Sequence, residues 1–367
     1  MTARVLRLSA LVFCGLGLVV GLFIGGAQWK PVAVGLPDAG ELASWVKQFV
    51  LLATTVLGIR TIGLVTRLAF FLPSDGDFLS RDGQHELRII IKWTSLWSVA
   101  NIFAGLFTLQ YVLGLSFSEL FTPSIIGTYL FDLAPSRSFI IAAIFAVAIA
   151  FLSTLIRSLN SVAILFGLAA AGIITPLLNS HSASLGDHSL AITSSIAHGL
   201  AMSLWVGGLW AIAPDVKNAN TEIIKKFSRL ASITVAALIL SGIAAAYARL
   251  DSITDLWSSG YGRLVVIKTL LFALIAYVAS KIRSGYIAGV SVIRLVGTEL
   301  LIMATAIGLG VALHAAPLSR SSLQLPSAAE EILGFVFPTK PTLTSLIFGC
   351  SRFALSSLGC IWQGLVG

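Results

Sequence analysis

The feature that most constrains this chain is a series of apolar runs, each about 20 residues long. A helix of that length crosses the hydrocarbon core of a bilayer, which is about 30 Å thick. Charged breaks and Pro- or Gly-rich breaks separate the runs, and this pattern predicts about ten spans. Their centres lie near residues 17, 55, 103, 147, 168, 202, 238, 272, 304 and 353. We therefore expect an all-α fold, a polytopic bundle of transmembrane helices.

Composition and charge agree with a membrane protein. Hydrophobic residues make up 57% of the chain and charged residues 11%, against roughly 25% charged residues in soluble domains. The net charge of +8 is explained if basic residues collect in cytoplasmic loops, as they do in membrane proteins. Placing the amino terminus in the cytoplasm assigns basic residues to the inner and outer loops at about two to one. We expect a multi-pass protein of the cytoplasmic (plasma) membrane, with the lipid bilayer as a partner and no nucleic acid.

The amino-terminal run is open to two interpretations. A basic start followed by an apolar stretch fits either a secretory signal peptide or a first membrane helix. The apolar run over residues 8–27 is longer than the usual core of a signal peptide. We therefore favour a helix that is retained.

An unusual set of side chains lies in HGLAMSLWVGGLW, residues 198–210. In a helix, with 100° between successive residues, Met202 and Trp205 fall on the same face as His198. This apolar run therefore carries an imidazole and a thioether on a single stripe.

A second predicted span repeats this pairing. Met303 and His314, eleven residues apart, also fall on one helical face. The two spans run in opposite directions, so Met202 and Met303 reach similar depths near the middle of the membrane. They are the only methionines besides the initiator.

Neutral imidazoles and thioethers together favour a soft metal ion such as Cu(I). Four of the five histidines fall on the extracytoplasmic side in this topology. The predicted path for copper begins in an outer loop and ends inside the bundle. Its proposed ligands are His181, His188, His198, His314, Met202 and Met303. The alternative is that the methionines fill gaps in an apolar core and that His198 hydrogen-bonds a neighbouring helix.

Other residues in these spans are candidates for function or packing. Lys268 and Glu299 are ionisable groups within predicted spans, where burial of a charge is costly. Gly207 and Gly208 allow two helices to approach closely. Tyr261 falls where an outer aromatic belt is expected. No nucleophile elbow, phosphate-binding loop or pair of carboxylates is present, so we expect no enzyme activity and no catalytic residue.

The second half of the chain resembles a known family of membrane proteins. Four elements occur in order over residues 198–317, and together they resemble the copper resistance D (CopD) family. They are HGLAMSLWVGGLW, KKFSRLASITVAALILSGIAAAY, LWSSGYGRLVVIKTLLFALIAY and RLVGTELLIMATAIGLGVALHAAP. The resemblance implies copper handling at the cytoplasmic membrane, as uptake, resistance or supply to cuproenzymes such as cytochrome oxidase. It supports His198 as a metal residue and marks further family positions of unknown role, namely Trp205, Gly207, Gly208, Tyr261, Arg263, Lys268 and Glu299.

Both ends of this region resemble CopD proteins that are joined to a CtaG-like cytochrome oxidase assembly domain. HSASLGDHSLAITSSIAHG is similar to the two-histidine loop of those proteins, and the tail is similar to a linker and the first CtaG-like helix. We therefore expect three parts: membrane helices over 1–178, a CopD-like copper-handling domain over 179–316, and an outer linker with one CtaG-like helix over 317–367. An extracytoplasmic copper chaperone or a CtaG-like assembly factor is the implied protein partner.

Two functions from other classes remain open at this point. His198 and His314 on facing helices could hold haem iron, as in a b-type cytochrome. The chain could also be a degenerate membrane scaffold without a metal. The three cysteines form no CxxC pair and lie in apolar segments, so they indicate neither a thiolate metal site nor a disulfide framework.

Overall fold

The structure is a computed structural model of the whole chain. It describes residues 3–31, 36–179, 188–217, 221–250, 252–288 and 292–317. The chain divides into two units, Met1–Arg320 and Ser321–Gly367, and all the described residues belong to the first unit. The predicted CtaG-like helix near residue 353 and the loop residue His181 therefore lie outside the described residues.

Almost all of the described chain is helical, as the sequence predicts. The long helices are α1 (Ala3–Gly25), α2 (Gly40–Thr66), α3 (Arg81–Leu113), α6 (Ala134–Leu155), α7 (Leu159–Leu178), α8 (His188–Lys217), α9 (Thr221–Tyr247), α11 (Gly260–Ala288) and α12 (Val292–Ala315). The short elements are a π-helical turn η1 (Arg67–Phe71), β1 (Ser74–Asp75), β2 (Phe78–Leu79), α4 (Phe117–Leu120), α5 (Pro123–Asp132) and α10 (Asp255–Ser258). The two strands form a small antiparallel hairpin between α2 and α3.

Nine helices of the described part are long and apolar enough to cross a membrane. They coincide with the first nine of the ten spans predicted from hydropathy. The fold is thus an all-α polytopic bundle, and the chain is a multi-pass membrane protein.

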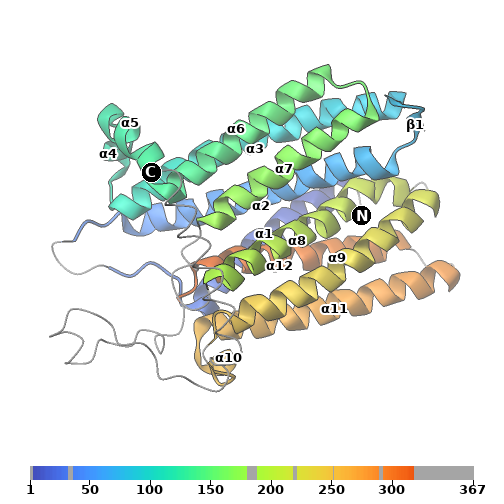
Figure 1. Cartoon of the computed structure of the whole chain (residues 1–367). Helices are drawn as coiled ribbons and strands as arrows, with labels where there is room; N and C mark the ends of the chain where they lie inside the picture. Colours follow the sequence, from blue (N-terminus) through green and yellow to red (C-terminus); the bar gives the residue numbers. More distant parts are fainter. Residues whose placement is uncertain are drawn as a thin grey trace, which may run out of the picture. The chain divides into compact units, whose positions relative to one another are not determined.

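The long helices pack into two groups that share α2 (Figure 1). One hydrophobic cluster joins α2 with α3, α6 and α7. The other joins α2 with α1, α8, α9, α11 and α12. The most extensive contact in the second group is between the first helix, α1, and the last, α12. The amino-terminal helix therefore packs as an integral part of the bundle.

Small residues bring the backbones of α2 and α8 together. Gly63 of α2 lies against Gly207 of α8, and a Cβ atom on either glycine would collide with backbone atoms of the other helix. Such an approach is open only to glycine and explains the Gly pair predicted to be a packing site. The second glycine of that pair, Gly208, lies against the ring of Phe227 in α9.

Local hydrogen bonds fix the helix ends beside the membrane spans. The Ser80 hydroxyl accepts a hydrogen bond from the Gly83 amide at the start of α3, and Gly114 ends that helix with a left-handed φ of 65°. Ser116 and Glu119 form a capping box at the start of α4. Hydrogen bonds from the Ser116 hydroxyl and amide hold the pKa of Glu119 below its ordinary value.

Candidate functional site: the histidine end of the bundle

His198 lies in the first half of α8 and is held by α9. Its Nδ1 is 3.2 Å from the Ser241 hydroxyl, and the imidazole also hydrogen-bonds the Leu238 carbonyl. The Ser241 hydroxyl donates its own hydrogen to the carbonyls of Ala237 and Leu238 within α9. Nδ1 therefore carries the proton and donates it to α9. The free lone pair of the ring is then on Nε2, which is the state required of a metal ligand.

Three further basic side chains surround His198, and each comes from a different segment. His198 lies within electrostatic range of Lys268 in α11, His314 in α12 and Arg249 just after α9. The Lys268 ammonium approaches Gly310 of α12, one turn before His314. We call these four residues the histidine cluster and the end of the bundle where they lie the histidine end. The structure thus brings together the histidines of the two spans that carry the predicted stripes.

Arg249 belongs to this cluster but was not predicted from the sequence. Its side chain is buried, with 8% of its surface exposed. Its guanidinium donates to the Ala191 carbonyl and to the Ser195 hydroxyl of α8, at 3.2 and 2.7 Å, and it also hydrogen-bonds the Tyr261 hydroxyl. Arg249 therefore ties together α8, α11 and the end of α9. Its only sequence signal was a charged residue directly after an apolar run.

The two predicted methionines lie deeper than the histidines. Met303 is buried in the hydrophobic cluster that joins α8, α9 and α12, and Met202 packs against the same cluster. Trp205 belongs to this cluster as well, and its ring meets that of Phe272 at a centroid distance of 5.9 Å. Helices α8 and α12 are in contact. Metal binding by these two thioethers stays a prediction.

The remaining predicted positions differ in their surroundings. Arg263 is exposed, whereas Glu299 is buried in α12 with 6% of its surface exposed. Tyr261, which falls where an outer aromatic belt is expected, has a buried side chain that hydrogen-bonds Arg249. His188 is the first residue of α8, and its side chain lies outside the described part.

The described donors at the histidine end suit a soft metal ion better than a hard one. In the described part of the chain, no three His, Cys, Asp or Glu side chains come together. The side chains that act electrostatically on His198 are all basic. Among the described side chains, this end of the bundle offers no set of carboxylate oxygens, which a hard divalent cation calls for. Imidazole nitrogen and thioether sulfur are neutral donors that suit Cu(I).

Comparisons with known proteins find a similarity in the second helix group. Residues 221–313, which include α9, α11 and most of α12, match the family model of copper resistance protein D. This region of the chain is similar to the CopD family. It is also similar to the copper transport protein CutJ of Bacillus subtilis (strain 168), with 28% identity over 116 residues. That alignment covers 29% of this chain, and the chain spans only 20% of the relative. No solved structure matches.

Proposed function

We propose that this protein binds copper at the histidine end of the bundle and carries it across the cytoplasmic membrane or delivers it to a copper enzyme. The observation that supports this proposal best is the family match, because the matched helices α9, α11 and α12 are those that surround His198. The similarity to the copper transport protein CutJ supports the same substrate. Copper is the cargo, and Cu(I) is the oxidation state that the nearby donors favour.

In this proposal His198 is the first ligand inside the membrane. Ser241 and Leu238 hold its Nδ1 proton, so that Nε2 presents a lone pair. Met202, one helical turn deeper, and Met303 in the same hydrophobic cluster would receive the ion next. His314 at the end of α12, with His188 at the start of α8 and His181 earlier in the chain, would supply copper from the outside. The predicted orientation, with a cytoplasmic amino terminus, places the histidine end outside the cell.

The decisive experiment replaces His198 by Ala in the full-length protein. We expect the Cu(I) affinity of the purified protein to fall by more than about 100-fold, because losing a metal ligand costs more affinity than losing the hydrogen bond that supports it. Competition with a coloured chelator measures this affinity. Cellular copper accumulation should fall to the level of cells without the protein. The matched control is His85→Ala, which removes an exposed imidazole at the opposite end of the bundle.

Two further measurements separate the competing functions. If His198→Ala and His85→Ala leave both copper affinity and accumulation unchanged, the copper proposal is wrong. A Soret band in the purified protein that disappears in His198→Ala would instead assign the histidines to haem. Replacing Met202 and Met303 together by Leu tests the inner donors, since Leu fills similar space without sulfur.

A further inference from the structure

A second basic site lies at the opposite end of the bundle, between α2, α3 and α8. It is a pocket of about 340 Å³ with an opening to the surface. We call it the arginine pocket. Its lining residues are Arg60, Arg88, Ile89, Lys92, Trp93 and Trp210. Three of the six are cations, and the described lining contains no carboxylate. Neither the family match nor the copper proposal uses this pocket.

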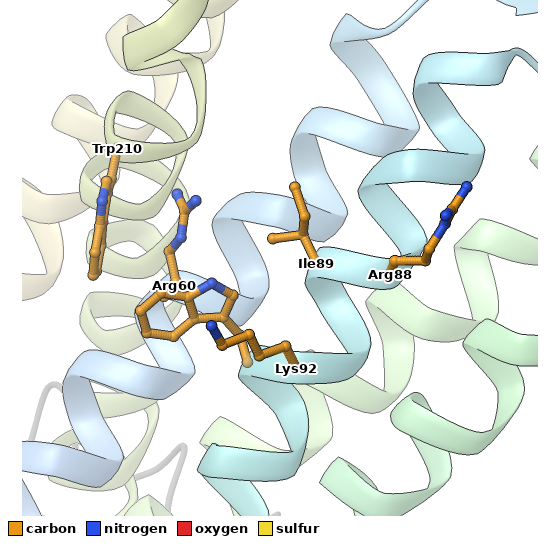
Figure 2. Close-up of a pocket in the computed structure, with 6 residues that line it drawn as sticks. Arg60, Arg88, Ile89, Lys92 and Trp210 are labelled. Carbon is orange, nitrogen blue, oxygen red and sulfur yellow. The ribbon is translucent and has the colours of Figure 1, made fainter. Parts of the chain in front are cut away.

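Two indole rings fix the first of these cations. The guanidinium carbon of Arg60 is 4.8 Å from the ring centroid of Trp210 and 5.6 Å from that of Trp93. The two rings meet edge to face at 5.8 Å. Cation–π contacts of this kind orient an Arg side chain. Figure 2 shows Arg60 and Lys92 on the Trp210 side of the pocket, with Arg88 beyond Ile89 and pointing away.

The other two cations lie on α3. Arg88 and Lys92 are four residues apart, so they lie on the same face of α3, and both are exposed. No ion pair in the described part of the chain involves either of them. The nearest acidic residue along α3, Glu86, is buried and pairs with Arg67 at 2.6 Å. The Glu86 carboxylate therefore pairs with a cation that does not line the pocket.

The pocket lies at the depth of a phospholipid headgroup. Helix α3 has 33 residues, which is about 50 Å of helix and well beyond the thickness of the hydrocarbon core. The stretch from Trp93 to Leu113 contains no charged residue and spans about 30 Å, the thickness of that core. Lys92 and Arg88 therefore begin where the hydrocarbon ends. Trp93 occupies the interface, where indole rings are enriched.

We propose that the arginine pocket binds the phosphate of an anionic phospholipid headgroup. Arg60 and Lys92 would contact the phosphate oxygens, and Arg88 would guide the headgroup at the opening. Ile89 and Trp93 would contact the glycerol and the first carbons of an acyl chain. Basic pockets between membrane helices recognise lipid phosphates in this way, and Arg suits phosphate oxygens through its planar set of donors. The position at the edge of the hydrocarbon favours a lipid over a soluble phosphate.

Native mass spectrometry of the full-length protein can test this site. The probes are phosphatidylglycerol, phosphatidylcholine with the same acyl chains, and inorganic phosphate. We expect phosphatidylglycerol to bind more tightly than phosphatidylcholine. In the double variant Arg88→Gln/Lys92→Gln, the ratio of the two lipid affinities should be about 30-fold smaller, since each cation near a lipid surface contributes to binding anionic lipid.

The matched control is Arg81→Gln/Lys225→Gln, which removes two exposed cations from the same end of the bundle but none from the pocket. It should keep the preference of the unmodified protein. Equal binding of the two lipids, or an equal loss in the control variant, would overturn the proposal. So would displacement of phosphatidylglycerol by inorganic phosphate, which would indicate a soluble anion. Copper affinity should stay unchanged in both variants, so this test is independent of the proposed function.

Discussion

The two ends of this bundle present two basic sites that differ in one chemical respect. The histidine cluster contains two imidazoles beside Lys268 and Arg249. The described lining of the arginine pocket consists of three cationic side chains, two indoles and an isoleucine. An imidazole has a neutral form with a lone pair, whereas a guanidinium has none. We therefore propose a metal ion as the ligand of the first site and an anion as the ligand of the second.

A single helix, α8, contributes side chains to both sites. Helix α8 carries His198 in its first half and Trp210 in its second half, about 18 Å apart along the helix axis. Between them, Gly207 meets Gly63 of α2, the helix that carries Arg60. The contact between α2 and α8 thus fixes the depth of each site relative to the other.

The largest effect is expected from changing that contact. In Gly63→Ala, the new methyl group would collide with the Gly207 backbone, and neither helix can yield without moving its side chains. We expect a loss of at least about 1 to 3 kcal/mol in the free energy of unfolding, the range for overpacked interiors. Both copper and lipid binding should fall. Thermal unfolding followed by size-exclusion chromatography measures the change.

The control for this prediction is Gly167→Ala. Gly167 lies in α7, and a Cβ atom there would have no neighbour within 4 Å. Because Ala favours a helix over Gly, this variant should be as stable as the unmodified protein or slightly more stable. Equal stability of Gly63→Ala and Gly167→Ala would show that the α2–α8 contact does not hold the two ends together.

The next effect concerns the histidine end alone. Ser241→Ala removes the hydroxyl that accepts the Nδ1 proton of His198, although the Leu238 carbonyl remains. We expect Cu(I) affinity to fall about tenfold, the lower end of the range for residues that support a metal ligand. The control Ser232→Ala removes an exposed hydroxyl of the same helix that bonds only within α9. If both variants bind Cu(I) equally, Ser241 does not orient the ligand.

Much of the fold followed from the sequence, because membrane spans are encoded locally. An uncharged run of about 20 residues must cover its own backbone with helical hydrogen bonds, so hydropathy alone located the nine helices. The Gly pair at 207 and 208 was also correctly predicted as a packing site. In these cases the deciding information lies within one helix.

The parts that could not be predicted depend on neighbours from other helices. Tyr261 begins α11, and the helical period does not reveal that its hydroxyl meets Arg249 from the end of α9. Ser241 is one of many serines in apolar helices, and only the structure sets it beside His198. The arginine pocket combines residues from three helices, with separations along the chain that no motif describes. The ligand roles of Met202 and Met303 stay predictions.

An effect of similar size but opposite sign is expected from Lys268. Its ammonium group lies within electrostatic range of His198 and would repel a bound cation. Lys268→Met keeps a similar length without the charge, so Cu(I) affinity should rise about tenfold, the effect of one nearby charge at intermediate dielectric. Lys225→Met, at the other end of the bundle, should leave the affinity unchanged. Weaker binding in Lys268→Met would mean that the amine assists the metal instead of opposing it.

The smallest effect tests whether the indoles of the arginine pocket only orient Arg60. Trp210→Leu removes one cation–π contact and one edge-to-face contact, which together contribute about 1 to 2 kcal/mol to stability. The preference for phosphatidylglycerol should fall only a few-fold, because Arg88 and Lys92 keep their charges, and Cu(I) affinity should not change. Trp257→Leu, which removes an exposed ring, is the control. A complete loss of lipid preference in Trp210→Leu would mean that Arg60, held by this ring, carries the site and that the two exposed cations of α3 contribute little.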